Sequence, residues 1–484
     1  MPGSASSQRR RIALVTTEPL GPAMAGPAIR AVELGRVLAT EHEVVVATTA
    51  ACDGAAPTGL TWRAVDTAGL RAIAAASDVL VLGGDVLAAN DWLAGHAQRD
   101  ADGGAKRAAK RGAEGGAAIV VDLYDPFHLE QLEQARDLGE ERRRRVVFDC
   151  IDVLNTQAAL GDTFLCASDR QRDLWTGHLA ACGRVNPATY DADPTLGELL
   201  RIVPFGVPDE PPQRLDEPVL RGVVDGIGPD DEILLWGGGI YNWFDPQTLI
   251  KAVDVLRSKR PNLRLVFMGA RHPNPAVATM RAAVGARELS ESLGLTGVHV
   301  FFSDTFSSGW VPYADRGRYL AEATIGVSTH HDHIETAFSF RTRVLDYFWA
   351  GLPVVTTRGD AMADLVEAAG AGRTVTPGDV DGLAAALHEL LDDKALRTNA
   401  AQASRQLADS FRWSVVAAPL IEFCRHPYRA PDLADPALRA AIGRRASLAA
   451  PATLSGRVRR LRSLAAADGW PAAAKAVARR ARPH

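Results

Sequence analysis

Cysteine is scarce in this chain and is not arranged for cross-linking. The 484 residues contain five cysteines, none of them in a Cys-x-x-Cys pair: Cys52, Cys150, Cys166, Cys182 and Cys424. An odd number of scattered cysteines argues against a disulfide framework and against a zinc knuckle. We therefore expect a protein of the reducing cytoplasm.

Long apolar runs are also missing. Near the N-terminus Arg9, Arg10 and Arg11 are followed by an apolar stretch of only Ile12–Val15, which is too short for the core of a signal peptide. No run approaches the ~18 apolar residues of a membrane span. These absences favour a cytoplasmic protein and leave peripheral contact with the inner face of the membrane open.

Two common phosphate-binding fingerprints are absent as well. The loop after the first predicted strand has no Gly-x-Gly-x-x-Gly pattern, and the glycine triplet Gly237–Gly239 is not followed by Gly-Lys-Ser/Thr. Neither half of the chain carries a dinucleotide fingerprint, which argues against a nicotinamide-dependent oxidoreductase. The triplet is likewise not a Walker loop.

The chain is long enough for two hydrophobic cores, and its apolar residues are spread evenly. Strands alternate with helices in both halves, which predicts an α/β fold. We expect an N-terminal domain, a linker rich in Pro and acidic residues, a C-terminal domain, a last helix and a basic tail, at residues 11–208, 209–231, 232–411, 412–424 and 425–484. Residues 95–117, rich in Ala, Gly, Lys and Arg, are typical of a surface insertion.

The first domain begins with a strand at 11–17, a loop containing Gly21 and Gly26, and a helix from about residue 29. Glycines there let a backbone approach a ligand closely, although flexible turns alone would also explain them. A later strand at 118–123 leads into Asp125 and His128. Ionisable side chains at the carboxyl end of a strand more readily line a cleft than a core. Capping of the next helix by Asp125 and a plain surface role for His128 remain alternatives.

The second domain repeats the alternation of strands and helices. A strand at 232–236 precedes Gly237, Gly238, Gly239 and Tyr241, and Asp245-Pro246 is typical of a helix start. Adjacent glycines between a strand and a capped helix can fold around an anion. This loop contains no Lys or Arg, so the positive charge for a diphosphate must come from elsewhere.

The stretch from His330 to Gly359 carries the most specific pattern. It follows a predicted strand at 325–328, becomes a helix at 342–349, and ends in a turn before the strand 354–357. This segment resembles the nucleotide-sugar motif of family 4 glycosyltransferases. The Trp-Gly-Gly-Gly-Ile-Tyr-Asn-Trp and Phe-Ser-Phe-Arg-Thr-Arg segments resemble those of bacterial members from polysaccharide-type gene clusters. The resemblance covers roughly residues 11–424 and implies the GT-B fold, in which two Rossmann-like domains face each other across a cleft.

The sequence departs from the family at one position. Family members have two glutamates eight residues apart before an Ala-x-Gly-x-Pro-Val turn. Here Asp346 stands in the second position and Phe338 in the first, and Glu335 is the nearest carboxylate. If Glu335 has taken over the missing role, the resemblance implies that it contacts the donor sugar.

The resemblance implies a nucleoside diphosphate sugar as donor and a glycan, a glycolipid or a small molecule as hydroxyl acceptor, without cofactor or metal. We expect arginines to hold the diphosphate, because guanidinium groups match phosphate oxygens. Asp346 would bind the ribose, and Asp125 or His128 would contact the sugar or the acceptor. The predicted donor site contains Gly237, Gly238, Gly239, Tyr241, Arg271, Trp310, Pro312, Tyr313, Phe340, Arg341, Arg343 and Asp346; the catalytic candidates are Glu335, Arg271, Arg343, Asp125 and His128; and the acceptor-side loop contains Gly21 and Gly26.

Several alternatives stay open. Arg341 and Arg343 could instead pair with Asp332 or Glu335, and Trp310 could simply belong to the core. The run His330–His333 has the composition of a metal site, but neighbouring residues cannot all face one ion. The displaced glutamate also allows a catalytically inactive GT-B protein that binds nucleotide sugars or serves in assembly.

The charge is uneven along the chain. Residues 425–484 hold thirteen Lys or Arg and three Asp, although the whole chain carries a net charge of −4. Val458, Leu461 and Leu464 lie at helical spacing among arginines, which is compatible with an interfacial helix on an anionic membrane. The simpler interpretation is a solvated Ala/Arg-rich extension. We expect no nucleic-acid partner.

Overall fold

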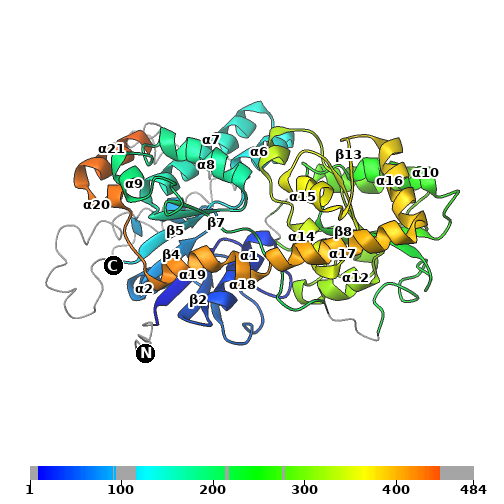
Figure 1. Ribbon diagram of the computed structural model, residues 1–484, viewed down its shortest axis with the longest axis horizontal. Helices are drawn as coiled ribbons and strands as arrows, with labels where there is room; N and C mark the ends of the chain where they lie inside the picture. Colours follow the sequence, from blue (N-terminus) through cyan, green and yellow to red (C-terminus); the bar gives the residue numbers. More distant parts are fainter. Residues whose placement is uncertain are drawn as a thin grey trace, which may run out of the picture.

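The computed structural model describes residues 9–90, 92–93, 116–212, 217–274, 277 and 279–446. These residues form two α/β domains, one on each side of the molecule in Figure 1, as the sequence predicts. The expected insertion at 95–117 lies outside the described residues, apart from its last two. Within the described residues, no helix is both long and apolar enough to span a bilayer.

The N-terminal domain is built on a seven-stranded parallel sheet of order β3-β2-β1-β4-β5-β6-β7. Its central strands are apolar runs buried on both faces, as expected for a sheet covered by helices. The strands are β1 (Arg11–Thr16), β2 (Glu43–Thr48), β3 (Thr61–Ala64), β4 (Val79–Leu82), β5 (Ala118–Asp122), β6 (Thr163–Cys166) and β7 (Leu200–Ile202). The helices are α1 (Gly26–Leu38), α2 (Thr67–Ala76), α3 (Val86–Ala89), α6 (Phe127–Gln134), α7 (Glu140–Leu160), α8 (Asp169–Ala181) and α9 (Pro187–Ala192).

The C-terminal domain has a six-stranded parallel sheet of order β10-β9-β8-β11-β12-β13. Its strands are β8 (Glu232–Gly239), β9 (Leu263–Gly269), β10 (Val300–Phe302), β11 (Ile325–Ser328), β12 (Val354–Thr357) and β13 (Gly372–Val375). Its helices are α10 (Pro246–Leu256), α11 (Arg281–Ser292), α12 (Arg316–Glu322), α13 (Ile334–Phe338), α14 (Thr342–Ala350), α15 (Ala361–Ala369), α16 (Val380–Asp392) and α17 (Lys394–Ser410). Asp245 caps α10 by accepting a hydrogen bond from the Thr248 backbone, in the place that the sequence indicated.

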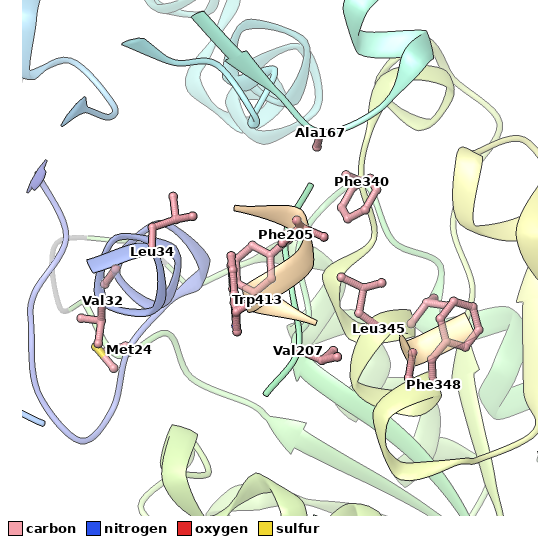
Figure 2. Close-up of a cluster of buried hydrophobic side chains, with 14 of the residues drawn as sticks. Met24, Val32, Leu34, Ala167, Phe205, Val207, Phe340, Leu345, Phe348 and Trp413 are labelled. Atoms are coloured by element: carbon pink, nitrogen blue, oxygen red, sulfur yellow. The ribbon is translucent and has the colours of Figure 1, made fainter. Parts of the chain in front are cut away.

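One apolar cluster runs from domain to domain. Trp413 packs on Phe205, with ring centroids 5.0 Å apart. Figure 2 shows these two rings between Leu34 of α1 and Leu345 of α14. A Cβ on Gly206 would lie 2.6 Å from the Trp413 ring, so this position accepts only glycine. The chain therefore crosses back to the N-terminal domain through a tightly packed contact.

The crossing segment differs from the single helix expected at 412–424. It consists of α18 (Trp413–Val416) and α19 (Ala418–Arg425). Pro419 lies in the first turn of α19 and has no backbone N–H to continue the preceding helix, which explains the interruption. Trp413, Leu420 and Phe423 are nonetheless buried, as their spacing predicts.

The first part of the basic tail expected at 425–484 is helical. Helices α20 (Pro431–Ala434) and α21 (Pro436–Ala446) lie on the N-terminal domain (Figure 1). Asp432 forms an ion pair with Arg184, 2.8 Å apart, and neither side chain is exposed. Removing one partner of such a pair would leave a buried, unpaired charge. Val458, Leu461 and Leu464 lie outside the described residues.

Candidate active site

A cavity of about 430 Å³ lies between the two domains. It opens at the carboxyl ends of strands of both sheets, where α/β proteins bind ligands. The N-terminal wall includes Glu18, Met24, Gly26, Tyr124, Asp125, Glu130, Gln131 and Gln134. The C-terminal wall includes Gly237, Gly238, Gly239, Tyr241, His272, Trp310, Tyr313, Arg316, Phe340, Arg341, Arg343 and Asp346.

The three glycines of the C-terminal wall end strand β8 instead of forming a separate loop after it. The pairing with β9 shifts between Trp236 and Gly239, and Gly238 has a φ of +70°, which favours glycine. A Cβ on Gly269 of β9 would lie 2.7 Å from the Gly238 carbonyl oxygen. The irregularity thus requires glycine on both strands, while a Cβ on Gly238 itself would point into open space.

Arg343 is the central cation of this wall. Its side chain is 7% exposed, lies over the rings of Trp236 and Phe244, and donates a hydrogen bond from Nη2 to the Gly239 carbonyl oxygen at 2.7 Å. Its Nη1 atom is buried and has no hydrogen-bond partner among the described residues. Burial lowers the pKa of Arg343 to about 10, so the guanidinium stays charged at neutral pH. A buried cation without a carboxylate partner is costly, and an anion in the cavity would relieve that cost.

Arg341 lies in the same wall but is neutralised. Its Nη1 and Nη2 donate to the two carboxylate oxygens of Glu335 at 2.9 and 2.7 Å, and its Nε lies 3.4 Å from Asp360. Glu335 is 1% exposed and does not line the cavity. Of the two alternatives raised by the sequence, the structure places Glu335 in the ion pair with Arg341.

Asp346, predicted to belong to the donor site, lines the cavity, and its side chain is 30% exposed. Its Oδ1 accepts a hydrogen bond from Nε of Arg316 at 3.0 Å. The Arg316 guanidinium lies 3.7 Å from the Tyr313 ring centroid, which fixes its direction. One Asp346 carboxylate oxygen therefore has a protein partner, and Oδ2 is left to accept hydrogen bonds from a ligand.

The N-terminal wall presents carboxyl groups. Asp125 and Glu130 hydrogen-bond to each other, with Asp125 just before α6 and Glu130 in its first turn. Burial raises the pKa of Asp125 to about 6, and burial together with the charge of Asp125 raises the pKa of Glu130 well above its usual range. The pair therefore holds one proton near neutral pH. Glu18 accepts a hydrogen bond from the Asn274 amide at 3.2 Å, which connects the two domains at the cavity.

Five predicted site residues lie elsewhere. Glu335 is in the ion pair described above. The His128 ring packs on Trp175, with centroids 5.6 Å apart, and burial lowers its pKa to about 4. The Arg271 side chain is 73% exposed, with Nη2 3.6 Å from Asp304. Gly21 lies against Asp53, and Pro312 precedes the 3-10 turn η3 (Tyr313–Asp315).

The histidines of the run His330–His333 point apart. His330 is buried, with Nε2 3.3 Å from Asp360, whereas the His331 side chain is 54% exposed. His333 caps α13 by accepting from the Thr336 backbone. No group of three or more His, Cys, Asp or Glu side chains in the described part of the chain is arranged to hold a metal ion.

Sequence reasoning missed several lining residues, chiefly Arg316, Glu18 and His272. No motif marks Arg316, which reaches the cavity from a separate helix, α12. Glu18 and His272 follow strands β1 and β9, and their position after a predicted strand was an available signal. Glu130 stood in a segment already suspected of lining the cleft, but its pairing with Asp125 depends on how α6 begins.

Comparison with known proteins points to one protein group. Residues 231–393 match the family model described as group 1 glycosyl transferases. No curated protein sequence matches the chain. Solved structures match it at low identity over most of its length. Sucrose-phosphate synthase from Thermosynechococcus elongatus aligns with a TM-score of 0.58 and 15% identity, over 86% of this chain and 98% of that one.

Two further structures agree. WaaG, a glycosyltransferase involved in lipopolysaccharide biosynthesis, gives a TM-score of 0.57 and 19% identity, over 86% of this chain and 100% of that one. HepE from Anabaena, in complex with UDP and glucose, gives a TM-score of 0.56 and 14% identity, over 86% of this chain and 99% of that one. The chain therefore has the GT-B fold, and its residues 231–393 match a group 1 glycosyl transferase domain.

Proposed function

We propose that this protein is a glycosyltransferase that moves a sugar, of the hexosyl type, from a nucleoside diphosphate sugar to a hydroxyl acceptor with retention at the anomeric carbon. The proposal includes family 4 membership, a role in bacterial polysaccharide biosynthesis, and catalysis without a bound metal. It also places the protein in the cytoplasm, with a glycan or glycolipid as acceptor.

The observation that carries the proposal is the uncompensated charge of Arg343. Its Nη1 atom is buried without a partner beside the glycine-rich end of β8, whereas neighbouring Arg341 is neutralised by Glu335 and Asp360. An arginine in this state suits a phosphate oxygen, which accepts charge-assisted hydrogen bonds. The described C-terminal wall thus offers one strong anion position.

The other lining residues would contact the ribose and the base of the donor. Asp346 would accept hydrogen bonds from the ribose hydroxyls through its free oxygen, and Trp310 and Tyr313 would form the wall beside the base. In the reaction, the bond between the anomeric carbon and the diphosphate oxygen breaks, and its electron pair stays on that oxygen. The acceptor oxygen bonds to the same face of the carbon, and its proton passes to the departing phosphate. Arg343 would stabilise the charge that develops on the diphosphate.

The comparisons support this assignment. The matched family model is one of glycosyl transferases, and HepE was also crystallised in complex with UDP-glucose. Asp125 would orient the acceptor hydroxyl from the opposite wall. A peripheral contact between the basic tail and an anionic membrane remains part of the proposal. Glu335 acts in it as a positioning residue for Arg341 and has no direct contact with the donor.

A second function, a GT-B protein that binds nucleotide sugars without transferring them, has one observation in its favour. Phe338 occupies the position of the first family glutamate, and Glu335 is held in an ion pair outside the cavity. Turnover separates the two functions. Release of nucleoside diphosphate with sugar transfer supports the first, and binding without transfer supports the second.

The experiment measures the melting temperature with UDP, GDP and ADP, followed by titration calorimetry with the best ligand. A ligand that binds the native state raises the melting temperature by mass action. The Arg343→Lys variant keeps the charge but loses the two-pronged geometry, and we expect about tenfold weaker binding. Arg373→Lys, at an exposed ion pair with Glu389 in the same domain, is the matched control.

Binding should persist in EDTA. If none of the nucleotides shifts the melting temperature at millimolar concentration, the proposal fails. If the wild type and Arg343→Lys bind the nucleotide with equal affinity, Arg343 does not hold the diphosphate and the proposal loses its main support.

A further inference from the structure

The cations that line the cavity lie in one wall, and all lining carboxyl groups except Asp346, which pairs with Arg316, lie in the other. The cations that line it, Arg316, Arg341 and Arg343, all come from the C-terminal domain. The N-terminal domain contributes the carboxyl groups of Glu18, Asp125 and Glu130 and, among the described lining residues, no Lys, Arg or His. A ligand that spans the cavity therefore meets opposite charges at its two ends.

The N-terminal domain does have an arginine behind this wall, but it is fully engaged. Arg30 is 1% exposed, and its Nε and Nη2 donate to the two oxygens of Asp122 at 2.6 and 3.1 Å. Its Nη1 and Nη2 also donate to the carbonyl oxygens of Pro204 and Val203, each at 2.8 Å. A ligand could recruit Arg30 only by breaking a buried network, so this side chain is not a second anion site.

The carboxyl groups of the wall are not neutralised by cations of their own domain. Glu18 accepts a hydrogen bond from the uncharged Asn274 amide, and Asp125 and Glu130 share a proton with each other. The wall therefore keeps negative charge near neutral pH. Carboxylates accept hydrogen bonds, and the protonated member of the pair can also donate one.

A second, independent observation marks the cavity as a ligand site. The Arg343 side chain in the facing wall is more than nine-tenths buried, and its Nη1 has no partner among the described residues. This atom defines where an anion would sit, and the position belongs to the C-terminal wall. The cavity therefore has one anion position, and under the proposed function the donor diphosphate occupies it.

We propose that the acceptor is a polyhydroxyl compound without phosphate or carboxylate groups, held through its hydroxyls by Glu18, Asp125 and Glu130. The inference rests on the proposed function, since it names the acceptor class of the same site. Hydroxyls donate hydrogen bonds to carboxylates, whereas a phosphate offers mainly acceptors and would be repelled by like charge. Sugar phosphates and uronic acids are therefore poor acceptors.

The test uses the full chain, the donor that binds best, and matched acceptors. Each set contains a neutral sugar, its amino-sugar analogue, its 6-phosphate and its uronic acid, from the glucose, galactose and mannose series, together with neutral oligosaccharides. Released nucleoside diphosphate and the glycosylated product are both measured. We expect transfer to neutral or amino members, with kcat/KM about a hundredfold lower for the anionic partner.

Two variants test whether the preference for uncharged acceptors comes from the carboxyl groups of the N-terminal wall. Glu18→Gln removes a charge but keeps the shape, and we expect it to raise the anionic-to-neutral rate ratio about tenfold. Glu133→Gln is the control, because Glu133 lies on the same helix as Glu130 but pairs with Arg136 and does not line the cavity. The control should leave the ratio at its wild-type value.

An anionic acceptor used as well as its neutral partner would overturn the inference, as would a Glu18→Gln ratio equal to that of Glu133→Gln. Failure to transfer to any acceptor of the panel would also overturn it. In each of these cases the nucleotide still raises the melting temperature. Loss of nucleotide binding would instead overturn the proposed function, so the two failures are distinguishable.

Discussion

The phenolic oxygen of Tyr347 accepts a hydrogen bond from the backbone N–H of Gly237 at 2.8 Å and shares its own proton between two carbonyl oxygens, of Leu235 at 3.0 Å and Val327 at 2.8 Å. Helix α14 is thereby joined to the ends of β8 and β11. A Cβ on Gly326 would lie 2.3 Å from the Tyr347 ring, so the ring reaches this position only over a glycine. Arg343 lies one helical turn before Tyr347, and the contact therefore fixes both the glycine-rich strand end and the arginine that faces the cavity.

Tyr347→Phe should weaken both the fold and the site. The change leaves the Gly237 N–H and two carbonyl groups buried without this partner, which costs about 1–3 kcal/mol. We expect a loss of that size in the free energy of unfolding, measured by urea denaturation, and weaker nucleotide binding by calorimetry.

Tyr428→Phe is the matched control for that variant. The Tyr428 hydroxyl donates to the Glu198 carbonyl and accepts from Arg201 in the N-terminal domain, away from the cavity. This control should lower stability without changing nucleotide affinity. If both variants bind the nucleotide equally well, Tyr347 has no role in positioning the site.

Asp346→Asn should weaken nucleotide binding by roughly 1.5–3 kcal/mol, because a charge-assisted hydrogen bond to the ribose becomes a neutral one. The structure adds a second effect, since Arg316 loses its ionic partner while it keeps its place over Tyr313. The melting temperature should fall only slightly. Calorimetry with a nucleoside diphosphate checks the affinity, and an unchanged dissociation constant would mean that Asp346 serves only Arg316.

Glu335→Gln separates the two roles that the sequence allowed for this residue. The variant removes the charge that neutralises Arg341 and should destabilise the fold by about 3 kcal/mol, less if Asp360 compensates. Nucleotide affinity should rise, because a second cation then faces the diphosphate. A variant with normal stability and affinity but slow turnover would instead place Glu335 at the donor sugar.

The strands and most of the C-terminal wall could be predicted from the sequence. Apolar runs such as those of β9 and β12 are bounded by turn residues, and the segment after β11 has a distinctive order of charges. Asp346, Arg343 and Tyr241 accordingly line the cavity. Local signals suffice there because Tyr241 directly follows β8, and Arg343 and Asp346 lie on the helix that leads into β12.

His128 and Arg271, which were predicted to lie in the site, lie outside the cavity for geometric reasons. His128 and Glu130 are two positions apart on α6, about 200° around the helix, so only one of them can face the cavity. The Arg271 side chain extends along Gly309 and away from the cleft, since the Arg271 backbone N–H is bonded to the Gly309 carbonyl. The direction in which a loop leaves its strand depends on these distant contacts, which a single sequence does not display.

The raised pKa values of Asp125 and Glu130 make the free energy of unfolding depend on pH. Both pKa values are raised in the native state, that of Asp125 to about 6, so between about pH 4 and 6 the native state binds more protons than the unfolded state. The contribution of the pair to stability is greatest below the unfolded pKa values and is lost as pH rises through the native ones. The loss should continue above pH 6, because the pKa of Glu130 is raised further. Groups whose native pKa is lowered act in the opposite direction. Asp360 does so at pH values below its ordinary 3.8. The histidines whose pKa burial lowers do so up to their ordinary 6.5; they are His42, His128, His178, His272 and His333.

Urea denaturation at pH 5, 6, 7 and 8 checks this prediction on the wild type, Glu130→Gln and the control Glu133→Gln. Glutamine cannot ionise but can still donate to Asp125, so Glu130→Gln should gain stability relative to the wild type as the pH rises and be more stable than the wild type at pH 8. The stability of Glu133→Gln should follow that of the wild type in parallel. Because Asp125 must be ionised to orient an acceptor hydroxyl, transfer should rise across pH 6 even as the contribution of the pair to stability falls. If the stability of Glu130→Gln and of the wild type changes by the same amount between pH 5 and pH 8, the two carboxyl groups do not share a proton.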